Sequence, residues 1–151
     1  MKLLKLLSFL CGCVLLVGCA SVPMTSATLD AEAKTFTPAP GKAGIYVYRD
    51  GRFTGSAVTF QAALDGRITG LLAPTTFQLL SVDPGPHALS AVGEMRKVQS
   101  LKFEAEGGKN YFFDFYATIG AFQPILHFKA MSDEEGRKAI LNSKRADTDI
   151  N

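Results

Sequence analysis

Apolar and polar residues alternate along the chain from residue 43 to residue 130, with glycine or proline breaks about every ten residues. A period of two is typical of β-strands that bury one face. The segments that we predict as strands are 45–49, 57–64, 67–72, 75–82, 87–92, 98–105, 110–118 and 124–130. About seven to eight short strands at this spacing predict a mainly β protein, an antiparallel β-sandwich.

Three turns connect these segments. Asp65-Gly66 is a strong two-residue hairpin signal, because glycine accepts a positive φ. Residues 83–86 (Asp-Pro-Gly-Pro) predict a tight turn. Residues 106–109 (Glu-Gly-Gly-Lys) predict a further hairpin that pairs 98–105 with 110–118.

The pattern changes after Met131. Ser132 resembles a helix N-cap, and the acidic residues 133–135 follow in the first turn, where the helix dipole favours them. We predict one short helix over 133–143, which completes a β-sandwich domain at 43–145, and a frayed tail over 146–151. The acidic run lacks the alternating ligand spacing of a calcium loop.

The first residues have the layout of a secretory signal peptide. A basic start (Met1–Lys5) precedes an apolar run of about a dozen residues, short of the ~20 that a membrane span needs. The run ends in Leu16-Val17-Gly18-Cys19, which resembles the bacterial lipobox, where cleavage before the cysteine exposes a thiol for acylation. We predict a signal peptide at 1–18, cleavage between Gly18 and Cys19, and lipidation of Cys19. An ordinary signal cut near Ala20 and an uncleaved anchor are the alternatives.

Residues 19–42 are rich in Ala, Ser, Thr and Pro, and we predict a flexible tether there behind the lipidated residue, with a brief helical turn near 29–34 as the exception. Membrane lipid would then be a partner through acylated Cys19. In enteric-type lipoproteins an Asp after the lipidated Cys retains the protein in the inner membrane. Ala20-Ser21 at this place implies the outer membrane, with the periplasmic face as the default orientation.

Composition narrows the function classes. The chain has 151 residues, a formal charge of +2 and 47% hydrophobic residues, which excludes disorder throughout. Removal of the signal peptide takes away Lys2 and Lys5 and leaves fourteen basic side chains against fourteen acidic ones. A neutral body does not predict a nucleic-acid partner. All three cysteines lie in the first nineteen residues, so the mature body would hold no disulfide and no cysteine-ligated metal.

The candidate chemistry is sparse. His87 follows the tight turn, and we predict that its ring braces this turn through a backbone carbonyl; an acid-base or ligand-facing role is the alternative. Asp114 and His127 would share a sheet face if their strands are neighbours, and could form a polar pair or an oriented imidazole. A hydrolase would also need a nucleophile, and three serines are candidates, but none of them lies in a nucleophile-elbow pattern. These serines are Ser81, Ser90 and Ser100. Two distant histidines predict no metal site, and no cofactor is expected.

Aromatic residues are densest at 111–116. Alternation puts Tyr111, Phe113 and Phe115 on one face, which we place in the core, and Phe112, Asp114 and Tyr116 on the other. We predict that the second face lies beneath the C-terminal helix; an exposed binding patch is the alternative.

Five short motifs occur in order: Gly-Ile-Tyr-Val-Tyr-Arg (44–49), Leu-Asp-Gly-Arg-Ile-Thr-Gly (64–70), Thr-Phe (76–77), Asp-Pro-Gly-Pro-His-Ala-Leu (83–89) and Gly-Lys-Asn-Tyr-Phe-Phe (108–113). As a set they resemble the bacterial lipoprotein family with domain of unknown function 2846, over about residues 41–140. The hairpin and the Pro-Gly-Pro-His turn also resemble small β-domains of the PEGA type. The resemblance implies no reaction, ligand or cofactor.

These observations favour a non-enzymatic accessory or interaction module of the cell envelope, held at the periplasmic face of the outer membrane by Cys19, with an envelope protein as its partner. A small-ligand binder or a hydrolase acting on an envelope substrate is the alternative. A third interpretation makes the helix-covered sheet a self-association surface.

Overall fold

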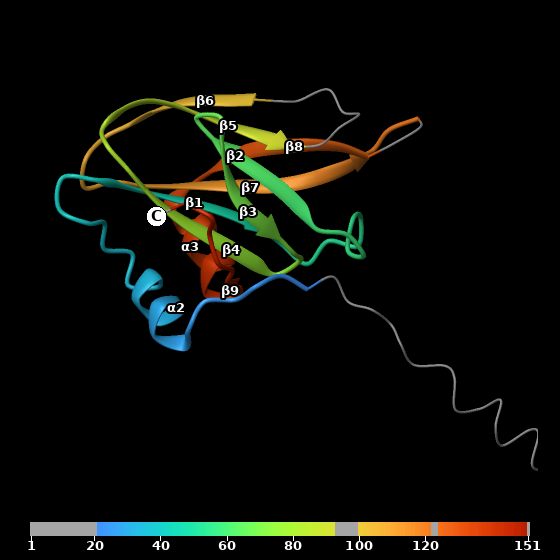
Figure 1. Cartoon of the computed structure of the whole chain (residues 1–151), viewed down its shortest axis with the longest axis horizontal. Helices are drawn as coiled ribbons and strands as arrows, with labels where there is room; N and C mark the ends of the chain where they lie inside the picture. Colours follow the sequence, from blue (N-terminus) through green and yellow to red (C-terminus); the bar gives the residue numbers. More distant parts are fainter. Residues whose placement is uncertain (1–20, 93–99, 122–123, 151) are drawn as a thin grey trace, which may run out of the picture.

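The computed structural model describes residues 21–92, 100–121 and 124–150, which form two β-sheets and two short helices (Figure 1). The five-stranded sheet has the order β8-β7-β1-β4-β9 and the four-stranded sheet the order β3-β2-β5-β6. The first sheet consists of β1 (Ala43–Arg49), β4 (Thr76–Val82), β7 (Asn110–Ile119), β8 (Pro124–Met131) and β9 (Lys144–Arg145). The second consists of β2 (Phe60–Leu64), β3 (Arg67–Leu72), β5 (Gly85–Val92) and β6 (Ser100–Ala105). The helices are α2 (Ala27–Ala33) and α3 (Asp133–Leu141).

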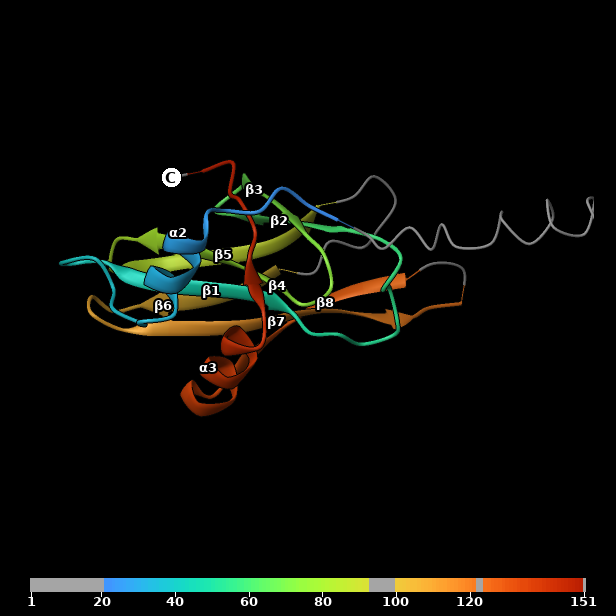
Figure 2. The same ribbon diagram turned by 90° about the horizontal axis from the view of Figure 1, so that it is seen from below.

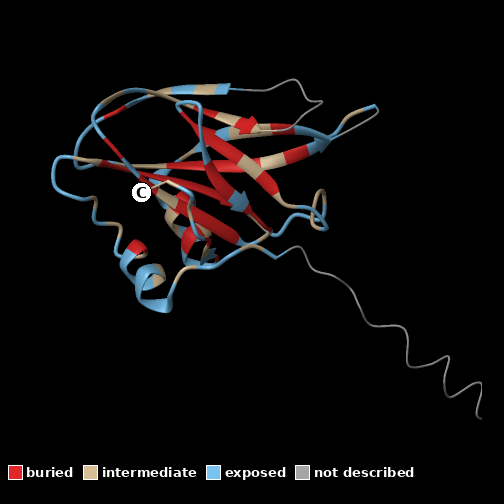
Figure 3. Ribbon diagram, viewed as in Figure 1, coloured by how far each residue is buried: buried red, intermediate tan, exposed pale blue. Residues whose placement is uncertain are grey.

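The main core lies between the two sheets. Alternate residues of β1 and β7, such as Val47 and Phe115, meet Phe60 and Leu89 from the second sheet. Figure 3 shows this buried interior running through the centre of both sheets. The predicted mainly β sandwich with a C-terminal helix is therefore confirmed.

The strand directions differ in part from the antiparallel prediction. Strand β1 pairs antiparallel with β4 but parallel with β7, and β4 pairs parallel with β9. Every residue of β1 is buried, because the second sheet covers one of its faces and the helices cover the other. The alternating pattern predicts strands but not their direction, so the mixed sheet could not be predicted from it.

The two predicted hairpins have different outcomes. The Asp65-Gly66 hairpin is confirmed: both residues have positive φ, +51° and +80°, and β2 pairs antiparallel with β3. The hairpin predicted at 106–109 is wrong. Strand β6 pairs with β5, whereas β7 pairs with β1 and β8, so this turn carries the chain from one sheet to the other. Both kinds of connection need the same glycine-rich turn, and only the packing of the core decides between them.

Helix α3 covers the outer face of the five-stranded sheet below β7 (Figure 2). The Ser132 hydroxyl accepts a hydrogen bond from the Glu135 N–H at 3.3 Å and donates one to the Glu135 carboxylate at 2.7 Å. This capping box starts the helix at the predicted residue. Phe112 is buried beneath α3 beside Tyr46 and Ile140, so the second aromatic face lies under the helix at this point, as predicted.

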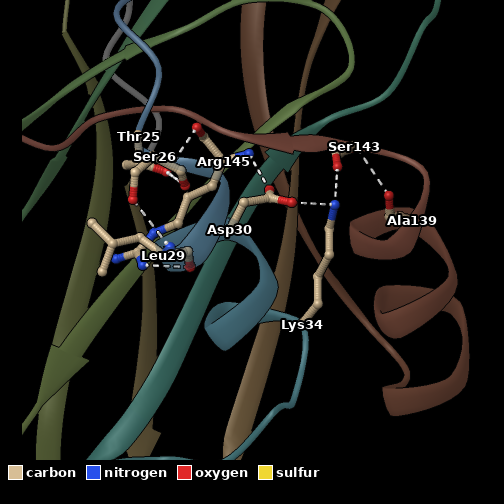
Figure 4. A network of polar contacts seen from close by, with 8 residues as sticks. All are labelled: Thr25, Ser26, Leu29, Asp30, Lys34, Ala139, Ser143 and Arg145. Atoms are coloured by element: carbon tan, nitrogen blue, oxygen red, sulfur yellow. Dashed lines mark hydrogen bonds and ion pairs between the residues drawn. The ribbon is translucent and has the colours of Figure 1, made fainter.

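The segment predicted as a flexible tether is largely packed against the body. Asp30 of α2 accepts hydrogen bonds from the backbone N–H of Arg145 at 2.7 Å and from Lys34 Nζ at 2.8 Å, and Lys34 also donates to the Ser143 carbonyl at 2.7 Å (Figure 4). The Tyr46 hydroxyl donates to the Ala33 carbonyl at 2.7 Å. Residues 23–36 therefore differ from the tether that their composition predicts, because contacts with distant residues order them. The helical turn expected near 29–34 is present as part of α2.

The tail predicted to be frayed from residue 146 onward is also packed against the body. The N–H of Ala146, which is buried, donates to the Phe77 carbonyl at 2.8 Å. Asp149 N–H donates to the Thr69 carbonyl at 3.1 Å, so the tail crosses to the second sheet. Among the residues described, no helix is both long and apolar enough to cross a membrane.

Candidate functional site

The polar pair proposed from the sequence is not formed. In the register of β7 and β8, Lys129 lies opposite Asp114 and His127 lies opposite Tyr116. Asp114 and His127 are therefore diagonal neighbours on the same face of the sheet and not directly opposite each other. Asp114 is instead bound by Arg52, with 2.5 Å between Arg52 Nη2 and Asp114 Oδ2. His127 stacks on Tyr116, and its Nε2 lies 2.8 Å from Thr118 Oγ1. The prediction of an Asp114–His127 pair is therefore wrong.

Arg52 is the centre of a polar cluster that sequence reasoning missed. Its Nε lies 2.8 Å from Asp50 Oδ2, and its guanidinium lies 4.9 Å from the centre of the Tyr116 ring. Asp114 is only 1% exposed, and its Oδ1 has no hydrogen-bond partner among the described residues. The available signal was an acidic residue in an aromatic strand, since a buried carboxylate needs a cation. The cation comes from 62 residues away, and no local pattern identifies it.

The cluster perturbs two acidic groups. Burial raises the pKa of Asp114, and the hydrogen bond and charge of Arg52 oppose this shift without cancelling it. Burial, together with the carboxylates of Asp114 and Asp50, raises the pKa of Tyr48 to about 12. The ionised Asp114 is thus less favourable in the folded chain than in the unfolded one.

We expect Asp114→Asn to be at least as stable as the parent at neutral pH, because the amide oxygen still accepts from Arg52 and no buried charge remains. A carboxyl group whose pKa is raised on folding stabilises the fold while it is protonated, and this contribution is lost as pH rises from its unfolded value of 3.8 through its folded value. Urea unfolding of the parent and of Asp114→Asn at pH values from about 3 upward measures this change in the free energy of unfolding. A clear loss of stability in Asp114→Asn at neutral pH would show that the ion pair stabilises the fold.

Arg49 holds the later part of the loop 50–59, whereas Arg52 lies at its start. Its side chain is 3% exposed and donates to the backbone carbonyls of Val58 (2.8 Å), Leu72 (3.0 Å) and Gly55 (2.9 Å). The guanidinium carbon lies 3.5 Å from the centre of the Phe60 ring. Burial lowers the pKa of Arg49 to about 10, so the group remains charged at neutral pH. We call Arg49 and Arg52 together the loop clamp.

His87 makes the turn-bracing contact that the sequence predicts. Its Nε2 lies 2.9 Å from the Asp83 carbonyl oxygen, and its Nδ1 lies 2.6 Å from Asp65 Oδ2. Both partners are acceptors, so the protonated imidazole, which has two N–H donors, fits this site best. Burial of the ring opposes the charge, but the hydrogen bonds to Asp65 and Asp83 outweigh it and raise the pKa of His87.

A raised histidine pKa makes stability depend on pH. The contribution of His87 is fully present below 6.5, the ordinary pKa of histidine, and is lost as pH rises through the folded value. We expect the free energy of unfolding to fall as pH rises above 6.5, and His87→Gln to remove this part of the fall. Thermal unfolding at several pH values compares the two proteins. Identical pH profiles for both would contradict the assignment.

A cleft of about 570 Å³ lies beside β4, between the sheets and under α2. Strand β9 pairs with β4 only at Thr76 and Phe77. The Phe77 carbonyl accepts from Ala146 and so points to the edge of β4 that faces away from β1. The backbone groups of Leu79 and Ser81 point to the same edge, because strand residues two apart share a direction. Leu79 and Ser81 line the cleft, so it offers backbone hydrogen-bonding groups to a ligand.

The remaining sequence candidates are dispersed. Ser81 and His87 both line the cleft, but both ring nitrogens of His87 are engaged by Asp65 and Asp83. Ser90 and Ser100 face one another across β5 and β6. Within the part of the chain that the structure describes, no group of three His, Cys, Asp or Glu side chains could hold a metal ion. Gly18, Cys19 and the rest of the predicted signal peptide lie outside the described residues.

Comparison with known proteins identifies the family of this chain. A protein of Haemophilus influenzae (strain KW20 Rd), itself described as uncharacterized, is 37% identical over 128 residues, which are 84% of this chain and 75% of that protein. Comparison with solved structures found no match. The family model described as "Protein of unknown function (DUF2846)" matches residues 39–126. The resemblance drawn from the motifs is therefore confirmed, and the chain belongs to the DUF2846 family.

Proposed function

We propose that this protein is a lipid-anchored lipoprotein of the bacterial envelope that acts as a non-enzymatic accessory or interaction module at the periplasmic face of the outer membrane. The observation that carries the proposal is the lipobox Leu16-Val17-Gly18-Cys19 at the end of a basic and then apolar segment. Several acyl chains on one residue anchor a protein firmly, since each buried CH₂ contributes about 0.8 kcal/mol.

The contacts of the polar side chains support a non-enzymatic role. Asp114 is tied to Arg52, both nitrogens of His87 are tied to the turns around it, and His127 contacts Thr118 and Tyr116. A general base needs a ring nitrogen within hydrogen-bond reach of the proton that it removes. These contacts instead hold strands and turns in place.

Anchoring is tested by Cys19→Ser, with Cys13→Ser as the matched control, because Cys13 lies within the apolar run and outside the lipobox. We expect the parent and Cys13→Ser to fractionate with the outer membrane and Cys19→Ser to lose this association. Membrane retention of Cys19→Ser would contradict lipid anchoring.

A partner is tested by crosslinking the tagged, lipidated protein in cells and identifying what it captures, with Cys19→Ser as the control. We expect one dominant envelope protein, lost when the folded body is replaced by an unrelated domain. Equal capture by the body and by the unrelated domain would contradict an interaction module.

A small-ligand binder is the second candidate, and the cleft beside β4 favours it. Its volume of about 570 Å³ lies within the range of roughly 300–1,000 Å³ usual for ligand pockets. Ser81→Phe would place a large side chain in this cleft. If the protein binds a small molecule there, the co-purified ligand seen by native mass spectrometry of the parent should be absent from Ser81→Phe.

A further inference from the structure

Two apolar side chains stand out from the described surface. Phe53 is 93% exposed and Ile119 is 87% exposed, whereas every other large apolar side chain of the described residues is at most 58% exposed. Phe53 lies in the loop 50–59 after β1, and Ile119 is the last residue of β7. Single exposed apolar residues are common on protein surfaces, so their positions decide whether these two act together.

Both side chains lie at one end of the sandwich. Strands β1 and β7 run parallel, with Tyr48 opposite Asp114, so the loop after β1 and the end of β7 leave the sheet in the same direction. Figure 1 shows the loop after β1, the last part of β7 and the first part of β8 at that end of the molecule. Val58 in the same loop and Ile125 in β8 are also exposed there. We call this surface, defined by Phe53, Val58, Ile119 and Ile125, the loop end.

The loop clamp fixes the position of Phe53. Arg49 binds the carbonyls of Gly55 and Val58 on one side of it, and Arg52 binds Asp50 and Asp114 on the other. The loop also closes on itself, with 3.0 Å between the Ser56 nitrogen and the Phe53 carbonyl oxygen. The exposure of Phe53 therefore belongs to a held loop, and the polar cluster around Arg52 has a role in displaying it.

The chain toward Cys19 begins at the same end. The Thr25 N–H donates to the Arg145 carbonyl at 3.1 Å, and Arg145 pairs with Phe77, which faces Tyr48 near the end of β1. In Figures 1 and 2 residues 21–26, which precede α2, run toward the loop end. Met24 lies five positions after Cys19 in the sequence, a stretch that reaches at most about 17 Å when fully extended. A lipidated Cys19 would thus hold this end close to the bilayer.

We infer that the loop end rests on the lipid surface, with Phe53 and Ile119 inserted among the lipids. The inference rests on the proposed function, because the acylated Cys19 supplies the attachment. The occupant is a bilayer because acyl chains on Cys19 would already place one within reach. The contact is apolar in character: the body beyond the signal peptide is neutral, and the charge of Arg52 is matched by Asp50 and Asp114.

Tryptophan fluorescence tests the contact, because the chain contains no tryptophan. The lipidated full-length protein is reconstituted into vesicles of phosphatidylethanolamine and phosphatidylglycerol, with and without brominated acyl chains. We expect brominated lipid to quench most of the emission of Phe53→Trp and of Ile119→Trp. The matched control is Glu106→Trp, in the exposed turn at the opposite end of β7, whose emission should be unaffected.

The outcomes separate the two proposals. If the protein floats with the vesicles but Phe53→Trp and Ile119→Trp are quenched no more than Glu106→Trp, the inference is overturned and the anchoring stands. If the parent protein carries no lipid and does not float, the proposed function fails and the inference fails with it. Quenching of both reporters with an unaffected control supports the inference, and flotation of all three variants like the parent shows that the substitutions spare the anchor.

Discussion

Replacing Arg49 with methionine is expected to lower the free energy of unfolding by about 3 kcal/mol. Methionine fills a similar length but offers no donor, so the carbonyls of Gly55, Val58 and Leu72 lose the hydrogen bonds that Arg49 supplies. Each buried acceptor left without a partner costs roughly 1–3 kcal/mol. The stacking of the guanidinium on Phe60 is lost as well. Urea unfolding followed by circular dichroism measures the loss.

The matched control is Arg67→Met, because Arg67 is exposed on β3. A surface change of this kind usually stays within about 0.5 kcal/mol. Arg49→Lys should fall between parent and methionine variant, since an ammonium group keeps the charge but not the planar fork that binds several carbonyls. If Arg49→Met and Arg67→Met cost the same, Arg49 does not hold the loop.

Gly136→Ala is expected to destabilise the protein by about 2 kcal/mol, although alanine is the better helix former. In an exposed helix the change would gain roughly 1 kcal/mol. At Gly136 the added Cβ would overlap with the Cβ and Cγ of Phe112. Phe112 is buried and stacks on Tyr46 with 5.0 Å between ring centres, so it has little room to retreat. Helix α3 would have to lift from the sheet.

Lys138→Ala is the control in the same helix, since Lys138 is exposed and its side chain meets no such overlap. Its effect should stay within about 0.5 kcal/mol. Thermal and urea unfolding compare both variants with the parent. A Gly136→Ala protein more stable than the parent would show that α3 does not pack this closely on Phe112.

Strands β1 to β8 were predictable because each carries its own signal. Alternation located β3 and β7 within a residue, and Asp65-Gly66 predicted the hairpin between β2 and β3, since only the local backbone decides such a turn. The strand β9 has two residues and no periodicity, so it could not be found in this way. The brief helical turn expected near 29–34 is part of helix α2, but its extent was not predictable, because residues more than a hundred positions away hold it.

The polar cluster could not be predicted from the sequence for a related reason. Alternation places Arg49 on the inner face with Ile45 and Val47, but it does not predict that the carbonyls of a following loop solvate the charge. The pairing of Asp114 with Arg52 depends on how the loop 50–59 folds back over β7. The rule that a buried carboxylate needs a cation predicts that a partner exists without saying which one.

The most direct test of the account is the intact mass of the protein extracted from membranes of its bacterial host. We predict a chain that begins at Cys19 and carries a diacylglyceryl group and an additional acyl chain, with a peptide map that places all of the added mass on the first residue. A chain without added lipid mass, whether it begins near Ala20 or at Met1, would contradict the central claim that this protein is a lipid-anchored member of its family.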